Sequence, residues 1–269
     1  MSLLLGYNTN GFSHHRLDDA LRVIASLGFR SVGLTLDVHH APPGATDYAA
    51  LGARLRALDL VPVIETGARF LLDPDRKHRP TLLSDDPRPR LDFYLECLEI
   101  AVTVGATSIS LWSGAGDSWE RLVPGLAQVC DRADALGIDV AFEPEPGMFV
   151  ATMEQFDELR RRLPHPRLGL ALDIGHLHCL EAEPPEVFLE RYADVLRNVH
   201  LDDHRRGVHE HLFFGDGEID FGPVMRALLK LAEARDLPAT VELSRHGHDA
   251  AATARRAWTF LSAAATGAG

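Results

Sequence analysis

The chain has 269 residues, 46% of them hydrophobic, and its 39 acidic and 27 basic side chains give a formal charge of −12. This negative charge disfavours binding to nucleic acid, because such binding rests on basic surface. The three cysteines form no CxxC pair, no apolar run approaches the roughly 18 residues of a membrane span, and the N-terminus lacks the pattern of an export signal, so we expect a cytoplasmic protein without disulfides or membrane contact.

Eight short apolar runs predict strands that are buried on both faces. Most of them begin about 30 residues apart, which is the size of one βα unit. The runs are residues 3–7, 31–36, 61–65, 107–112, 138–143, 168–173, 196–201 and 239–243.

Helical patterns separate these runs. Apolar residues repeat at helical spacing from Leu17 to Leu27 and stop at Gly28, a typical helix C-cap. The same periodicity marks residues 90–104, 119–136, 152–163, 221–236 and 249–264. Eight alternating units predict an α/β fold with a single (β/α)8 TIM barrel over residues 1–265, followed by a disordered tail at 266–269. The long, Pro-rich segment 66–90 is typical of a lid or a substrate wall.

Four of the predicted strands carry an acidic or imidazole side chain at, or one residue before, their C-terminal end: Glu143, Asp173, His200 and Glu242. Such side chains are costly inside a buried strand but natural at its C-terminal tip, where parallel barrels form their active sites. Three carboxylates and one imidazole would hold one divalent cation and leave positions open for a substrate. We expect Mn²⁺, Mg²⁺ or Co²⁺, with Zn²⁺ as a further option.

The chain also carries motifs that resemble a known family. They are FEPEPG (142–147), LDIGH (172–176), VHLDDHRR (199–206), HEHLFFGDGEIDF (209–221) and VELSRH (241–246). In this order they resemble the sugar phosphate isomerase/epimerase family of xylose isomerase-like TIM barrels, which includes ketose 3-epimerases, hydroxypyruvate isomerase, inosose dehydratase and endonuclease IV. The resemblance covers essentially the whole chain and is more specific in its C-terminal half.

The resemblance implies roles for individual residues. The shared metal site of the family matches Glu143, Asp173, His200 and Glu242. His176 matches a histidine that contacts substrate, and Arg206 matches a substrate-binding arginine of the ketose epimerases. His209 and His211 match the place where endonuclease IV-type members hold an additional zinc. Glu65 and Trp112 stand where those nucleases would carry histidines, which favours the single-metal sugar branch.

Two metal-bound carboxylates that flank a substrate can pass a proton across a planar enediolate while the cation stabilises the developing oxyanion. We therefore expect a metal-dependent isomerase or epimerase of a sugar or related polyhydroxy carbonyl compound, with Glu143 and Glu242 as catalytic bases. Further candidate substrate contacts are His176, Arg206, Glu65, Trp112, His209 and His211.

Three alternatives stay open. A dehydratase acting on a keto-sugar or inosose would use the same metal site, with His209 or His211 as the acid for the departing hydroxyl. An endonuclease IV-like nuclease would need more metal ions than the pattern predicts. A barrel that binds a metabolite without catalysis would not need all four ligand positions filled. The expected partner is a small sugar-like molecule rather than nucleic acid or a membrane, and a homo-oligomer is compatible with the sequence.

Overall fold

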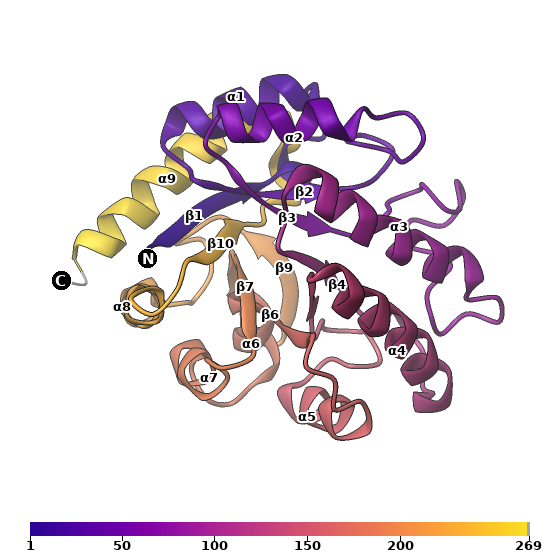
Figure 1. Cartoon of the computed structure of the whole chain (residues 1–269). Coiled ribbons are helices and arrows are strands. Elements are labelled where there is room, and N and C mark those ends of the chain that lie inside the picture. The colour runs from indigo at the N-terminus through magenta and orange to yellow at the C-terminus, as the bar shows by residue number, and fades with distance from the viewer. Residues whose placement is uncertain (268–269) are drawn as a thin grey trace.

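The computed structural model describes residues 1–267, which form a closed barrel of parallel strands with helices around it (Figure 1). Around the barrel the strands follow the order β1-β10-β7-β6-β5-β4-β3-β2. Their bounds are β1 (Leu3–Asn8), β2 (Ser31–Thr35), β3 (Val61–Glu65), β4 (Ser108–Leu111), β5 (Asp139–Phe142), β6 (Leu168–Asp173), β7 (Leu196–Leu201) and β10 (Leu237–Val241). The predicted (β/α)8 TIM barrel is confirmed.

Helices cover the outside of the barrel (Figure 1). Their bounds are α1 (Leu17–Leu27), α2 (Tyr48–Ala57), α3 (Arg88–Val104), α4 (Trp119–Leu136), α5 (Met153–Arg162), α6 (Ile174–Leu180), α7 (Pro185–Arg191), α8 (Phe221–Ala232) and α9 (Ala250–Thr266), with short 3-10 helices η1 (Thr9–Phe12) and η2 (Ser244–Asp249). Among residues 1–267, none of these helices has the length and apolar content needed to cross a membrane.

Local sequence signals account for several element ends. Gly28 follows α1 with a φ of 104°, a left-handed conformation that glycine adopts without the steric cost of a Cβ. At the start of α5, Thr152 and Gln155 form a reciprocal capping box, which satisfies backbone N–H groups that the first helical turn leaves free. All six residues of β6 are buried, as expected of a strand covered on both faces.

Helix α2, the short helices α6 and α7, and an antiparallel hairpin formed by β8 (Asp203–Arg205) and β9 (Val208–Leu212) were not predicted from the sequence. Only three residues of α2 are buried, so its apolar stripe is narrow. None of the five residues of β9 is buried, so no apolar alternation marks that strand. At the other end of the chain, α9 continues through Thr266, the first residue of the predicted tail, and residues 268–269 lie outside the described part.

One buried arginine holds the long segment between β3 and α3. Arg90, which is 0% exposed, donates from Nη1 to the carbonyl oxygen of Thr66 at 3.0 Å, from Nη2 to that of His78 at 3.0 Å and from Nε to that of Pro80 at 2.8 Å. Its guanidinium lies 5.1 Å from the ring centroid of Trp112. Because three carbonyls of the segment bind one buried group, the segment is a fixed wall beside the ends of β3 and β4.

Candidate active site

Four neighbouring strands bring the predicted metal ligands together. Glu143 directly follows β5, Asp173 ends β6, His200 lies in β7, and Glu242 directly follows β10. These strands are adjacent in the barrel, and Asp173 pairs with His200 in the β6–β7 register. One donor atom from each of the four side chains lies within 4.8 Å of the others. The topology thus converts four distant sequence positions into one group of three carboxylates and one imidazole.

His200 is at the centre of this group. Its Nδ1 lies 3.0 Å from Oε1 of Glu143 and 3.3 Å from Oε2 of Glu242, while its Nε2 lies 3.0 Å from Oε1 of Glu65. Burial alone would lower the pKa of His200, but the Glu65 and Glu143 carboxylates outweigh it and hold the pKa well above its usual value. Glu65 therefore orients the ring, in the way that second partners orient metal-bound histidines.

The donor set fits a divalent cation. Oδ2 of the buried Asp173 has no hydrogen-bond partner among residues 1–267. Burial raises the pKa of Asp173 well above its usual value and that of Glu143 to about 7. Ionisation of either carboxyl group therefore costs free energy at this site. A cation among them would offset that cost. Three oxygen donors and one imidazole nitrogen suit Mn²⁺, Mg²⁺, Co²⁺ or Zn²⁺.

Asn10 is a site residue that is not among the predicted metal ligands and substrate contacts. It lies in η1, just after the first strand, and its Nδ2 donates to Oε1 of Glu242 at 2.8 Å. The two residues are 232 positions apart in the sequence, so no local sequence pattern predicts their hydrogen bond. A polar residue close behind a predicted barrel strand was the available signal. Asn10 holds one oxygen of Glu242 while the other faces His200.

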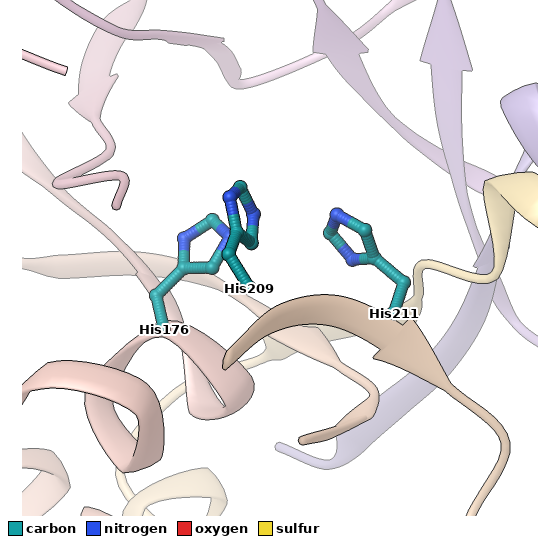
Figure 2. A group of neighbouring side chains, drawn as sticks. All are labelled: His176, His209 and His211. Atoms are coloured by element: carbon teal, nitrogen blue, oxygen red, sulfur yellow. The ribbon is translucent and has the colours of Figure 1, made fainter. Parts of the chain in front are cut away.

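Three histidines form a second group, which is drawn in Figure 2. His176 comes from α6, while His209 and His211 come from β9, and one ring nitrogen of each lies within 4.8 Å of the others. His176 Nδ1 lies 3.2 Å from the carbonyl oxygen of Pro144. Among residues 1–267, Nε2 of His176 and Nε2 of His209 are buried without a hydrogen-bond partner. Both nitrogens are therefore available to oxygens of a bound molecule.

The three imidazoles differ in charge. Burial, followed by the positive charge of His211, lowers the pKa of His176 well below its usual value and that of His209 to about 4. Burial would also lower the pKa of His211, but the contact with Asp202 prevails and raises it to about 10. At neutral pH the group thus contains two neutral rings and one imidazolium.

A cavity of about 350 Å³ opens above these groups. Its walls include most of the predicted site residues: Glu143, Glu242, Glu65, Trp112, His176, His209 and His211. Glu145 also lines it, and burial together with the charge of Glu143 raises the pKa of Glu145 to about 8. Glu145 is not among the predicted site residues.

Arg206 is not among the residues that line the cavity. It is exposed at the turn of the β8–β9 hairpin, next to Gly207 with its φ of 74°, and its Nη1 donates to the carbonyl oxygen of Glu181 at 2.6 Å. The guanidinium is thus held by the Glu181 carbonyl outside the cavity lining, and the contact of Arg206 with substrate stays a prediction.

Two inosose dehydratases are among the curated proteins that are similar to this chain. The chain is 32% identical over 129 residues to an inosose dehydratase of Lacticaseibacillus casei, an alignment that covers 42% of this chain and 43% of the relative. An inosose dehydratase of Geobacillus kaustophilus (strain HTA426) is 32% identical over 130 residues, with 42% of each chain covered. The matched segment is thus less than half the length of these curated relatives.

Solved structures with low sequence identity share the fold over nearly the whole chain. A structure of an L-ribulose 3-epimerase has a TM-score of 0.77 at 19% identity and covers 100% of this chain and 96% of the other. A structure of the IOLI protein with a zinc atom has a TM-score of 0.76 at 17% identity, with 100% and 99% covered. The model of the xylose isomerase-like TIM barrel family matches residues 8–263. The resemblance that the motifs carry is confirmed, and the chain belongs to the xylose isomerase-like TIM barrel family.

Proposed function

We propose that the protein is a divalent-metal-dependent isomerase or epimerase of a sugar or related polyhydroxy carbonyl compound. The observation that carries this proposal is the shared position of Glu143 and Glu242. Both carboxylates approach the same nitrogen of His200, at 3.0 and 3.3 Å, and both line the cavity. Two carboxylates at one point beside a substrate cavity suit removal of a proton from carbon and its return.

The cation would be held by Glu143, Asp173, His200 and Glu242. When bound, it polarises the substrate carbonyl and stabilises negative charge on the oxygen. The oxygen-rich ligand set favours Mn²⁺, Mg²⁺ or Co²⁺, and Zn²⁺ is also compatible with four such donors.

The side chains of this chain supply the proton transfers. One of Glu143 and Glu242 removes the hydrogen on the carbon next to the carbonyl, and the other, or the same one, returns it. The bond from Asn10 fixes the direction of the Glu242 carboxylate, which lines the cavity. The unpartnered Nε2 of His176 is placed to bind a substrate hydroxyl. Trp112, backed by Arg90, forms an apolar wall against one face of the sugar.

A dehydratase using the same carboxylates is the second candidate. It would remove the same hydrogen but lose a hydroxyl from the next carbon as water. The name of the relatives, inosose dehydratase, and the histidines of β9 along the cavity favour it. We rank it second because the two carboxylates at one point suit the return of a proton.

Mass spectrometry in deuterated water distinguishes the two reactions. The metal-loaded protein is incubated with a panel of ketoses, inososes and keto acids. An isomerase or epimerase gives a product with the mass of the substrate apart from deuterium on carbon. A product lighter by one water establishes the dehydratase instead, and absence of deuterium exchange with every member of the panel refutes both. Glu233→Gln, an exposed glutamate at the end of α8, is the matched control for Glu242→Gln.

A further inference from the structure

Asp202 is a buried carboxylate whose position the proposed reaction leaves unexplained. It follows the end of β7, is 0% exposed, and does not line the cavity. Its Oδ2 contacts Nδ1 of His211 and lies 3.2 Å from Nε2 of His204. A fully buried carboxylate is costly unless it has partners, and both imidazoles offset part of that cost at Oδ2, while Oδ1 has no hydrogen-bond partner among residues 1–267.

Asp202, His211 and the cavity lie in that order. His211 stands between Asp202 and the cavity, since its Nδ1 contacts the carboxylate and its ring lines the cavity. His204 is fully buried and does not reach the cavity. His209 lines the cavity but has no contact with Asp202 within hydrogen-bond distance among residues 1–267. Only His211 therefore links the buried charge to the place of the substrate.

The residues around Asp202 hold it in place. A Cβ added at Gly175 would come within 2.3 Å of Oδ1 of Asp202 and 2.2 Å of Cδ2 of His204. The glycine at the start of α6 thus allows the helix to pack directly onto this pair. Such close packing leaves Asp202 no room to turn away from His211, which fixes the orientation of the imidazole.

We propose that His211 is the acid that protonates a substrate oxygen in this site and that Asp202 is the positioning residue that orients it. The proposal rests on the proposed function. As a carboxylate removes the proton from carbon, the electron pair of that C–H bond forms a C=C bond and the carbonyl π pair moves onto oxygen. That oxygen takes the proton from Nε2 of His211, which gives a neutral enediol and a neutral imidazole. The reverse transfer restores the imidazolium when carbon is reprotonated.

The charge on His211 supports this role. Its pKa is raised despite burial, and the groups facing it from neighbouring elements are Asp202, His204, His176, His209, Asp173, Glu242 and Glu145. A cation held by the metal ligands would weaken the influence of Asp173 and Glu242 but leave the direct contact with Asp202 intact. An imidazolium here also repels a second cation from the histidine group.

The test combines kinetics with a measurement that needs no substrate. In the metal-loaded full chain, His211→Gln should lower kcat by roughly 10²-fold or more, as expected for loss of a general acid. His209→Gln should raise KM with a smaller effect on kcat, because that ring can bind substrate but lacks the carboxylate behind it. His39→Gln, an exposed histidine away from the cavity, should leave both constants unchanged.

The pH profile distinguishes a positioning role of Asp202 from a purely structural one. The acid is lost as pH rises through the pKa of His211, so the wild-type kcat should fall only well above pH 7. In Asp202→Asn this alkaline fall should move towards the ordinary imidazole pKa, about 6.5. A fall that stays in place in a folded Asp202→Asn variant, or His211→Gln with more than half the wild-type kcat, overturns the proposal.

Imidazole NMR of the wild-type protein keeps the proposal falsifiable if Asp202→Asn does not fold or if no substrate is found. For this experiment the proposed cation site is filled with diamagnetic Mg²⁺ or Zn²⁺. A protonated His211 ring at pH 7.5 is the expected result. A neutral His211 ring, or loss of a second equivalent of metal in His211→Gln, overturns the proposed roles of His211 and Asp202. Failure of deuterium exchange in the wild type refutes the proposed function instead, so the two failures are distinguishable.

Discussion

Arg90 provides the sharpest stability prediction, because one side chain satisfies three carbonyls of the cavity wall. In Arg90→Met these carbonyls lose their donor. A buried polar group without a partner costs ~1–3 kcal/mol, so three of them would cost ~3 kcal/mol at the lower end. The lower end applies because the variant also removes the cost of burying a guanidinium and water can enter part of the space. At ~2–4 °C per kcal/mol for a chain of about this size, the Tm should fall by ~6–12 °C.

The assay is thermal unfolding of the wild-type protein, Arg90→Met and Arg88→Met, followed by circular dichroism. Arg88 lies two residues away on the same helix, pairs with Asp86 and has a side chain that is 80% exposed. Its loss should leave the Tm unchanged. If Arg90→Met melts within ~2 °C of the wild type, the loss is below about 1 kcal/mol and the three hydrogen bonds do not hold the wall.

Three further predictions concern the site. Glu242→Gln should retain most of its metal while turnover falls by ~10²-fold or more; near-normal turnover would remove Glu242 from the mechanism. Asn10→Ala should lower kcat/KM by about 10-fold or more, since a hydrogen bond to a charged group contributes ~1.5–3 kcal/mol, and an unchanged value would show that Glu242 needs no such support. Apparent Mn²⁺ affinity should rise with pH, because below its pKa of about 7 Glu143 holds a proton that the cation must displace. Calorimetry across pH 6–8 checks this, and a flat profile contradicts it.

Much of the barrel could be predicted because strands and helices alternate with clear apolar periods. The four candidate metal ligands could be located for the same reason, since Glu143 and Glu242 follow directly on apolar runs that give the strand ends. A parallel barrel places all such ends on one face. Because β5, β6, β7 and β10 are neighbours in the barrel, the four side chains at their ends lie close together.

The rest depended on contacts between distant positions. Asn10 lies 232 positions from Glu242, and Glu65 lies 135 positions from His200, so their roles follow from barrel closure rather than from local pattern. The β8–β9 hairpin carries His209 and His211 to the cavity, while Arg206 lies at its exposed turn. Both strands of the hairpin are mostly polar, so they leave no apolar alternation in the sequence, and the direction of the hairpin could not be predicted.

Metal content tests the central claim most directly. We predict about one tightly bound divalent cation per chain in the Mn²⁺-loaded wild-type protein and in the control His39→Ala, and a large loss in His200→Ala, because His200 supplies the nitrogen donor of the set. Elemental analysis after exhaustive dialysis gives the stoichiometry. Unchanged metal content in a folded His200→Ala variant would contradict the assignment of the cation to Glu143, Asp173, His200 and Glu242.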